Sequence, residues 1–138
     1  MIVSARVATW LLKTEPKTYS FADLVRDETT RWDGIANPTA LRHLRAAKKG
    51  DRAVVYHTGD ERAAVGVAEI ARAAYPDPND ASAVVVDLAA KTALKRPVTL
   101  ATLKSDPAFA ESPLVRQGRL SFLPLTEAQW KRLLELSK

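Results

Sequence analysis

Apolar and polar positions in the first thirty residues follow two different periods. Ala8 to Lys13 is a short apolar run that ends before Pro16, which cannot donate to a strand ladder, so a strand is predicted there. Ser20 then offers a side-chain cap, and residues 21–27 are predicted to form a short helix. Three apolar side chains are expected to share its buried face: Phe21, Leu24 and Val25.

A second helix is marked at both of its ends. Asn37 is a good N-cap, and Pro38 takes the first helical position, where a missing N–H costs nothing. Leu41 and Leu44 form the apolar stripe, and Gly50 is the stop signal. The opposite face carries three basic side chains: Arg42, Arg45 and Lys48.

From Asp51 onward, β-branched and small residues replace the helical period. Strands are predicted over residues 53–57, 64–72 and 83–93. They are divided by turn signals at Gly59-Asp60 and in the proline-rich stretch 76–80. These segments are predicted to be strands separated by turns.

The C-terminal third mixes short helices with one more strand. Thr99 is expected to cap a short helix, and residues 120–123 suit a last strand. Thr126 and Gln129 form a capping box that opens a C-terminal helix. Three of its side chains are expected to face the core: Trp130, Leu133 and Leu134.

The predicted order is strand, helix, strand, helix, and then several strands with late helices. Because this order lacks regular βαβ alternation, we expect a mixed α+β fold, a small curved β-barrel with flanking helices. Residues 1–138 show no repeat, low-complexity tract or linker, which favours a single domain. A closed barrel leaves a mouth where one small ligand can enter.

Composition narrows the possible chemistry. The chain has no cysteine, which excludes disulfides, thiolate metal sites and a cysteine nucleophile. His43 and His57 lie on different predicted elements with no ligand spacing, so neither a metal nor a cofactor is expected. Residues 1–9 carry Arg6 within a short apolar stretch, which predicts neither a signal peptide nor a membrane span, and a cytoplasmic protein is expected.

Charge points to a class of partner. The 138 residues carry a net charge of +5 at neutral pH, with an isoelectric point near 9.7. Such an excess favours polyanions, because each phosphate contact releases bound counterions. Five basic residues are candidates for phosphate contacts, of which we expect two or three near a binding mouth: Arg42, Arg45, Lys48, Arg116 and Arg119.

A series of short motifs spans nearly the whole chain, from Trp10 to Trp130. In order, they are Trp10–Pro16, Tyr19-Ser20, Trp32–Ile35, Asn37, Tyr56–Thr58, Val65–Glu69, Tyr75–Pro78 and Arg119–Ser121. Their order and spacing resemble the EVE domain family. The resemblance implies a PUA-like fold related to the YTH domains, and a reader of modified bases in DNA or RNA.

The resemblance also implies a set of pocket residues. Trp32 corresponds to a wall of an aromatic cage, and the remaining residues are expected to surround it: Lys13, Thr14, Ser20, Asn37, His57 and Thr58. Family members usually carry Arg and an aromatic residue around the Asn, whereas this chain has Ala36 and Pro38. Leu41 also replaces a second Arg, and Ser82-Ala83 replaces an aromatic, so a less polar rim is expected and the completeness of the cage stays open.

The leading hypothesis is a non-enzymatic module in which Trp32 stacks on a base while Asn37 and Thr14 read its edge. An alternative is an enzyme acting on a nucleotide or another small molecule, with His57 and either Glu15 or Asp33 as acid and base. A third class is a small-molecule-sensing or protein-interaction domain on the same fold. The sequence leaves open the base, DNA or RNA, and the oligomeric state.

Overall fold

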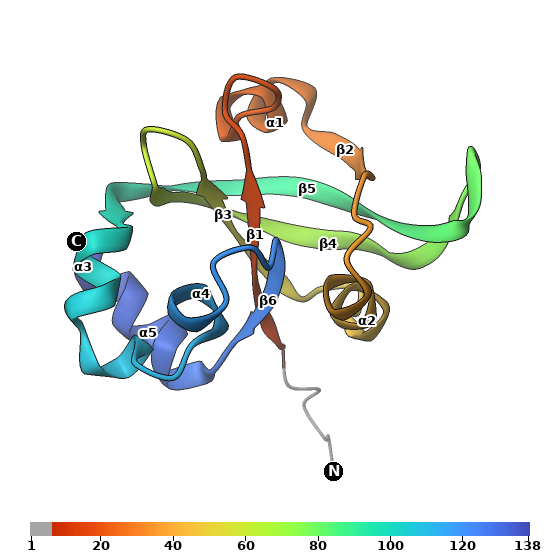
Figure 1. Ribbon diagram of the computed structural model, residues 1–138. Coiled ribbons are helices and arrows are strands. Elements are labelled where there is room, and N and C mark those ends of the chain that lie inside the picture. The colour runs from red at the N-terminus through yellow and green to blue at the C-terminus, as the bar shows by residue number, and fades with distance from the viewer. Residues whose placement is uncertain (1–6) are drawn as a thin grey trace, which may run out of the picture.

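Six strands form one mixed sheet at the centre of the structure (Figure 1). The computed structural model describes residues 7–138. The strands are β1 (Thr9–Thr14), β2 (Thr29–Trp32), β3 (Arg52–His57), β4 (Ala63–Asp77), β5 (Asp80–Thr99) and β6 (Phe122–Leu125). Their order is β2-β5-β4-β3-β1-β6, in which β1 and β3 run parallel and the other neighbours run antiparallel.

The fold is mixed α+β, as predicted, but the barrel is only approximate. β2 and β6 are the two edges of the sheet, and no pairing between them closes it within residues 7–138. Pro124 lies in edge strand β6, where a residue without an N–H is tolerated. The sheet is therefore open and curved rather than closed.

The helices cover both faces of the sheet. They are α1 (Phe21–Asp27), α2 (Pro38–Ala46), α3 (Leu100–Ser105), the 3₁₀ turn η1 (Pro107–Phe109), α4 (Pro113–Arg116) and α5 (Glu127–Leu136). Trp10 of β1 contacts His43 of α2. The residue before it, Thr9, pairs with Arg52 of β3, and the Arg52 guanidinium stacks on Trp130 of α5. Because successive strand residues point to opposite faces, α2 and α5 cover different faces of the sheet. α3, α4 and α5 cluster together, and α1 and α2 lie away from this cluster (Figure 1).

Four helices begin at the residues that the sequence marks, among them α3, where the Thr99 side chain accepts from Thr102 N. Ser20 and Asp23 form a capping box on α1, and Thr126 and Gln129 form one on α5. The Asn37 side chain accepts from Thr39 N and Ala40 N at the start of α2. Each cap satisfies backbone donors that have no partner within the helix. The helix that Gly50 was expected to stop already ends at Ala46.

Two predicted core residues are exposed instead. Val25 is 52% exposed and Leu134 is 38% exposed. In α1 the buried stripe runs through Phe21 and Leu24, and α5 buries Trp130 and Leu133. Helices this short bury only a narrow stripe, and residues one position beyond it turn to solvent.

The strands differ from the prediction in length and register. β4 and β5 run on through residues 73–84 into a hairpin that Figure 1 shows projecting beyond the other elements. This region is mostly exposed and has several register shifts, so it lacks the clean apolar alternation that marks a strand in sequence. The last strand starts at Phe122, two residues later than expected.

The core packs around the first strand. Trp10 is 7% exposed, stacks on Phe122 with ring centroids 5.2 Å apart, and donates its indole N–H to Asp51 Oδ2 at 3.0 Å. Trp130 is also buried, so both tryptophans predicted as core residues are core residues. No helix within the described residues is long and apolar enough to cross a membrane. The expectation about a signal peptide concerns residues 1–9, of which residues 1–6 lie outside the described part.

Candidate functional site

A cleft of about 360 Å³ opens beside the end of β1 and the edge strand β2. Seven residues line it: Thr14, Thr18, Tyr19, Thr30, Arg31, Trp32 and Asp33. The rings of Tyr19 and Trp32 meet edge to face, with centroids 5.8 Å apart and planes at 70°. Trp32 is only partly buried, so its indole is open to the cleft rather than sealed in the core. Two aromatic rings, hydroxyl groups, one guanidinium and one carboxylate thus share a single concavity.

Local hydrogen bonds hold Tyr19 in this position. Thr14 Oγ1 donates to the Tyr19 carbonyl at 2.6 Å, and the Tyr19 hydroxyl donates to Asp27 Oδ2 at 2.8 Å. Burial raises the pKa of the Tyr19 hydroxyl, and the hydrogen bond to Asp27 raises it further. The hydroxyl therefore stays a proton donor at neutral pH, and the ring is anchored at both ends.

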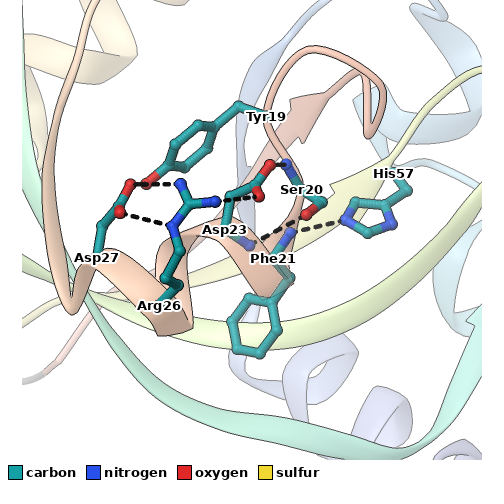
Figure 2. Close-up of polar contacts among 7 residues, drawn as sticks. All are labelled: Tyr19, Ser20, Phe21, Asp23, Arg26, Asp27 and His57. Atoms are coloured by element: carbon teal, nitrogen blue, oxygen red, sulfur yellow. Dashed lines mark hydrogen bonds and ion pairs between the residues drawn. The ribbon is translucent and has the colours of Figure 1, made fainter.

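Helix α1 supplies the support behind Tyr19, as Figure 2 shows. Arg26 bridges two carboxylates, with its Nε 2.9 Å from Asp27 Oδ1 and its Nη1 3.0 Å from Asp23 Oδ1. The hydrogen bond from Arg26 lowers the pKa of the Asp27 carboxyl, which stays ionised as the acceptor for Tyr19. Asp23 also closes the capping box with Ser20, and this bond lowers the Asp23 pKa. The Ser20 side chain is thereby engaged in capping.

His57 lies on the same face but ties β3 to α1. Its Nε2 accepts from the Phe21 backbone N–H at 3.0 Å, so its Nδ1 carries the proton and donates to Glu61 Oε1 at 2.7 Å (Figure 2 shows the bond to Phe21). The residue is 8% exposed. Both ring nitrogens are engaged, and the ring is not among the groups that line the Trp32 cleft.

Two other predicted pocket residues lie on the opposite face of the sheet. Lys13 Nζ donates to the Gly118 carbonyl at 2.8 Å and sits 5.9 Å from the Tyr56 ring centroid. It lines a separate cavity together with Thr58. Since Lys13 and Thr14 are successive residues of β1, their side chains diverge.

Asn37 borders a third hollow of about 290 Å³, with Arg119 on its rim. Its Oδ1 accepts two backbone N–H groups at the start of α2, from Thr39 at 2.9 Å and Ala40 at 3.0 Å. The amide oxygen is therefore engaged in capping. Of the seven residues predicted for the base pocket, the structure brings Trp32 and Thr14 together in one cleft.

The predicted phosphate contacts are exposed but dispersed. Arg42, Arg45 and Lys48 are exposed on or just after α2. Arg116 pairs with Glu111 at 3.1 Å, and Arg119 is exposed beside Asn37. Among residues 7–138, none of these five lines the Trp32 cleft.

Sequence reasoning missed several residues of the cleft, including Tyr19, Thr18, Thr30 and Arg31. Tyr19 could have been found, because it is an aromatic residue in a loop and the pair Tyr19-Ser20 belongs to the motif series. Thr30 and Arg31 carry no comparable signal, because a short edge strand brings them to the site.

A larger cavity, of about 660 Å³, lies at the start of β1 and along β6. Val7, the first described residue, forms part of its border, and none of the predicted site residues lines it. Within the described part of the chain, no cluster of three His, Cys, Asp or Glu side chains could hold a metal ion. The Trp32 cleft therefore carries the candidate chemistry.

Comparison with known proteins places the chain in a family. The model of the EVE domain matches residues 8–136. Human thymocyte nuclear protein 1 is 30% identical over 165 aligned positions, which cover 94% of this chain and 73% of that protein.

Solved structures agree with this match. A Rhodopseudomonas palustris protein is 42% identical with a TM-score of 0.90, covering 95% of this chain and 93% of that chain. Human thymocyte nuclear protein 1 in complex with DNA containing 5-methylcytosine is 29% identical with a TM-score of 0.87, covering 95% and 98%. An ASCH protein of Zymomonas mobilis, 15% identical with a TM-score of 0.61, shares the fold alone. The chain belongs to the EVE domain family, as the motifs from Trp10 to Trp130 predicted.

Proposed function

We propose that this protein binds nucleic acid and holds a single modified base in the Tyr19–Trp32 cleft. The observation that carries the proposal is the pair of aromatic rings, 5.8 Å apart, at the wall of a cleft of about 360 Å³. A base taken out of its stack needs an apolar surface for its flat face and fixed polar groups for its edge. The volume lies at the small end of ligand pockets, which suits one heterocycle.

A relative supports the choice of ligand. The human protein bound to DNA containing 5-methylcytosine superimposes with a TM-score of 0.87 over 95% of this chain. We therefore take 5-methylcytosine in DNA as the first base to test. RNA and other modified bases are the comparison ligands.

The cleft residues suggest a division of roles. Trp32 stacks on the base, and the hydroxyls of Thr18 and Thr30, which line the same cleft, contact its edge. Thr14 Oγ1 already donates to Tyr19, so it can only accept from a ligand. Arg31, the cation at the rim, is suited to the phosphate beside the base.

Asn37 takes a different role from the one the family resemblance suggested. Its Oδ1 caps α2, and it borders the hollow that contains Arg119. We assign this hollow, together with the exposed Arg42 and Arg45 on α2, to the nucleic-acid backbone.

Binding without catalysis fits the state of the histidine that an enzyme would use. Both His57 nitrogens are engaged, one by the Phe21 N–H and the other by Glu61. A general base needs a lone pair directed at its substrate, whereas the Nε2 lone pair already accepts a hydrogen bond from a backbone N–H. We therefore propose that His57 positions α1 and takes no part in a reaction.

The proposal is tested by titrating matched oligonucleotides with and without 5-methylcytosine against the protein and Trp32→Ala. Stacking is worth about 1–3 kcal/mol per base, so the substitution should weaken binding of the modified strand by about 5- to 150-fold. A buried methyl group contributes about 0.8 kcal/mol, so the unmodified strand should bind about fourfold more weakly.

Leu134→Ala is the matched control, since it removes an exposed apolar side chain on α5. It should bind like the unchanged protein, and thermal unfolding should show that Trp32→Ala is folded. Equal affinity of the unchanged protein and folded Trp32→Ala for both strands would refute the proposal.

A further inference from the structure

A second cavity, of about 220 Å³, lies on the face of the sheet opposite the Trp32 cleft. Ten residues line it: Lys13, Tyr56, Thr58, Gly59, Arg62, Leu100, Lys104, Leu114, Val115 and Gly118. Three of them are cations contributed by separate segments: β1, the loop before β4, and α3. No acidic side chain is among these lining residues.

Lys13 is fixed with its charge inside this cavity. Its Nζ donates to the Gly118 carbonyl at 2.8 Å and lies 5.9 Å from the Tyr56 ring centroid. Burial lowers the pKa of Lys13 because the ammonium group loses part of its hydration. An ammonium group has three protons to donate, and the bond to Gly118 uses one of them.

The Tyr56 hydroxyl adds a neutral donor. Tyr56 is 3% exposed, and burial raises the pKa of its hydroxyl, which keeps the proton in place. Tyr56 is among the residues that line the cavity, so its hydroxyl is a neutral donor that the lining offers.

Arg62 and Lys104 complete the positive side. Neither forms an ion pair with another residue of the described chain. Arg62 also holds a left-handed backbone conformation, with φ at 45°. Such a conformation is costly for a residue other than glycine and is found mainly at turns and ligand sites.

We propose that this cavity binds a phosphate group through Lys13, Arg62 and Lys104, with the Tyr56 hydroxyl as a fourth donor. A lining of donors without carboxylates selects for an anion, and three cations match a phosphate dianion better than a single carboxylate. The volume holds a phosphate with few further atoms and is below the usual range for pockets that enclose a whole drug-sized ligand.

The phosphate can come from two sources that share this chemistry. One is a free phosphorylated small molecule. The other is a nucleic-acid strand that passes around the end of β1, since the sheet separates this cavity from the Trp32 cleft. The proposal stands independently of base recognition, because its first test uses inorganic phosphate alone.

The test follows the backbone amide signals of Gly59 and Gly118 by NMR while inorganic phosphate replaces chloride at constant ionic strength. We expect saturable shifts at both glycines, because both line the cavity. Lys13→Met and Tyr56→Phe should each weaken binding, the first by about tenfold or more because it removes a charge-assisted bond. Lys131→Met, which removes an exposed charge on α5, is the control and should bind like the unchanged protein.

A second titration uses oligonucleotides with and without a 5′-phosphate, followed at the same two glycines. Shifts with inorganic phosphate identify a free anion as a sufficient ligand, and shifts only with an oligonucleotide identify the strand as the source. The proposal is overturned if neither ligand shifts these signals. It is equally overturned if Tyr56→Phe, which keeps the packed ring, and folded Lys13→Met both bind as the unchanged protein does.

Discussion

At the scale of single residues, two neighbours on β1 line two different cavities. Thr14 supports Tyr19 in the aromatic cleft, whereas Lys13 reaches across to Gly118 on the other face. Both belong to the same sequence motif, and the resemblance placed them in one pocket. Successive side chains of a strand point to opposite faces of the sheet, so the two residues are separated. Once the face of one residue is known, the face of the other follows.

Position 66 must be a glycine, because there is no room for a Cβ atom beside the Phe21 ring. A Cβ at this position would meet the Phe21 ring at 2.5 Å, and Phe21 is the first residue of α1. We expect Gly66→Ala to lower the free energy of unfolding by about 1–3 kcal/mol, as overpacking of a core does. Urea unfolding followed by circular dichroism measures it.

Gly118→Ala is the control for this prediction. A Cβ there has nothing within 4 Å, and the residue does not have a positive φ. The free energy of unfolding of Gly118→Ala should differ from that of the unchanged protein by no more than about 0.5 kcal/mol. Any change should be a small increase, because alanine reduces the conformational freedom of the unfolded chain. Equal losses in both variants would show that contact with Phe21 is not the cause.

At the scale of elements, short helices bury few side chains, and polar contacts at their ends help to hold them in place. α1 is a seven-residue helix whose capping box, Arg26 bridge and bond to His57 place Tyr19 at the cleft. Isolated helices of this length are not stable, so the burial of Phe21 and Leu24 and the bond from the Phe21 N–H to His57 decide that the helix exists. The cleft therefore depends on contacts behind it as much as on the rings that line it.

A similar contact joins η1 to α5. Arg132 Nε donates to Asp106 Oδ2 at 2.7 Å, and this bond lowers the pKa of the Asp106 carboxyl, helped by the Ala108 N–H. A carboxyl with a lowered pKa in the folded state stabilises that state above its ordinary pKa of about 3.9, and the contribution is lost as pH falls through the lowered value.

Asp106→Asn should therefore lower the melting temperature at pH 7, with the difference from the unchanged protein shrinking as the pH drops below about 4. The substitution keeps an oxygen to accept from Ala108, so the lost charge is what is measured. Asp60→Asn, on an exposed loop residue, is the control and should show little difference at either pH. A difference for Asp106→Asn that stays constant across pH would contradict the assignment.

At the scale of the whole molecule, the net charge of +5 is spread around the domain. Basic side chains lie on α2, beside Asn37, at the aromatic cleft and around the Lys13 cavity. Such a distribution attracts a polyanion at long range, while only the contacts near a site determine how it docks.

The salt dependence of binding tests which cations touch the strand. If Arg119 beside Asn37 contacts a phosphate, Arg119→Gln should reduce the slope of log affinity against log salt by about 0.9 for duplex DNA. Fluorescence anisotropy at several salt concentrations measures this slope. Lys131→Gln on α5 should leave it unchanged, and equal slopes for all three proteins would place the strand elsewhere.

Much of the architecture could be predicted because its signals are local. Ser20, Asn37, Thr99 and Thr126 all cap helices where the sequence places them, since a cap needs only the side chain and the next three N–H groups. The family followed from the order of the motifs, and the mixed α+β class followed from the order of the predicted strands and helices. The distal β4–β5 hairpin and the exposure of Val25 and Leu134 did not follow, because exposed strands and helix edges carry little apolar periodicity.

The sequence by itself determined the family, the helix starts and the aromatic residue at position 32. Only the tertiary structure decided which neighbours of Trp32 line its cleft, where Tyr19 and Arg31 lie and Lys13, Asn37 and His57 do not. The physical reason is that a cleft forms between segments distant in the chain, where strand register and helix packing set the direction of each side chain. A motif records which residues occur together, but the face on which each one lies is a property of the assembled sheet.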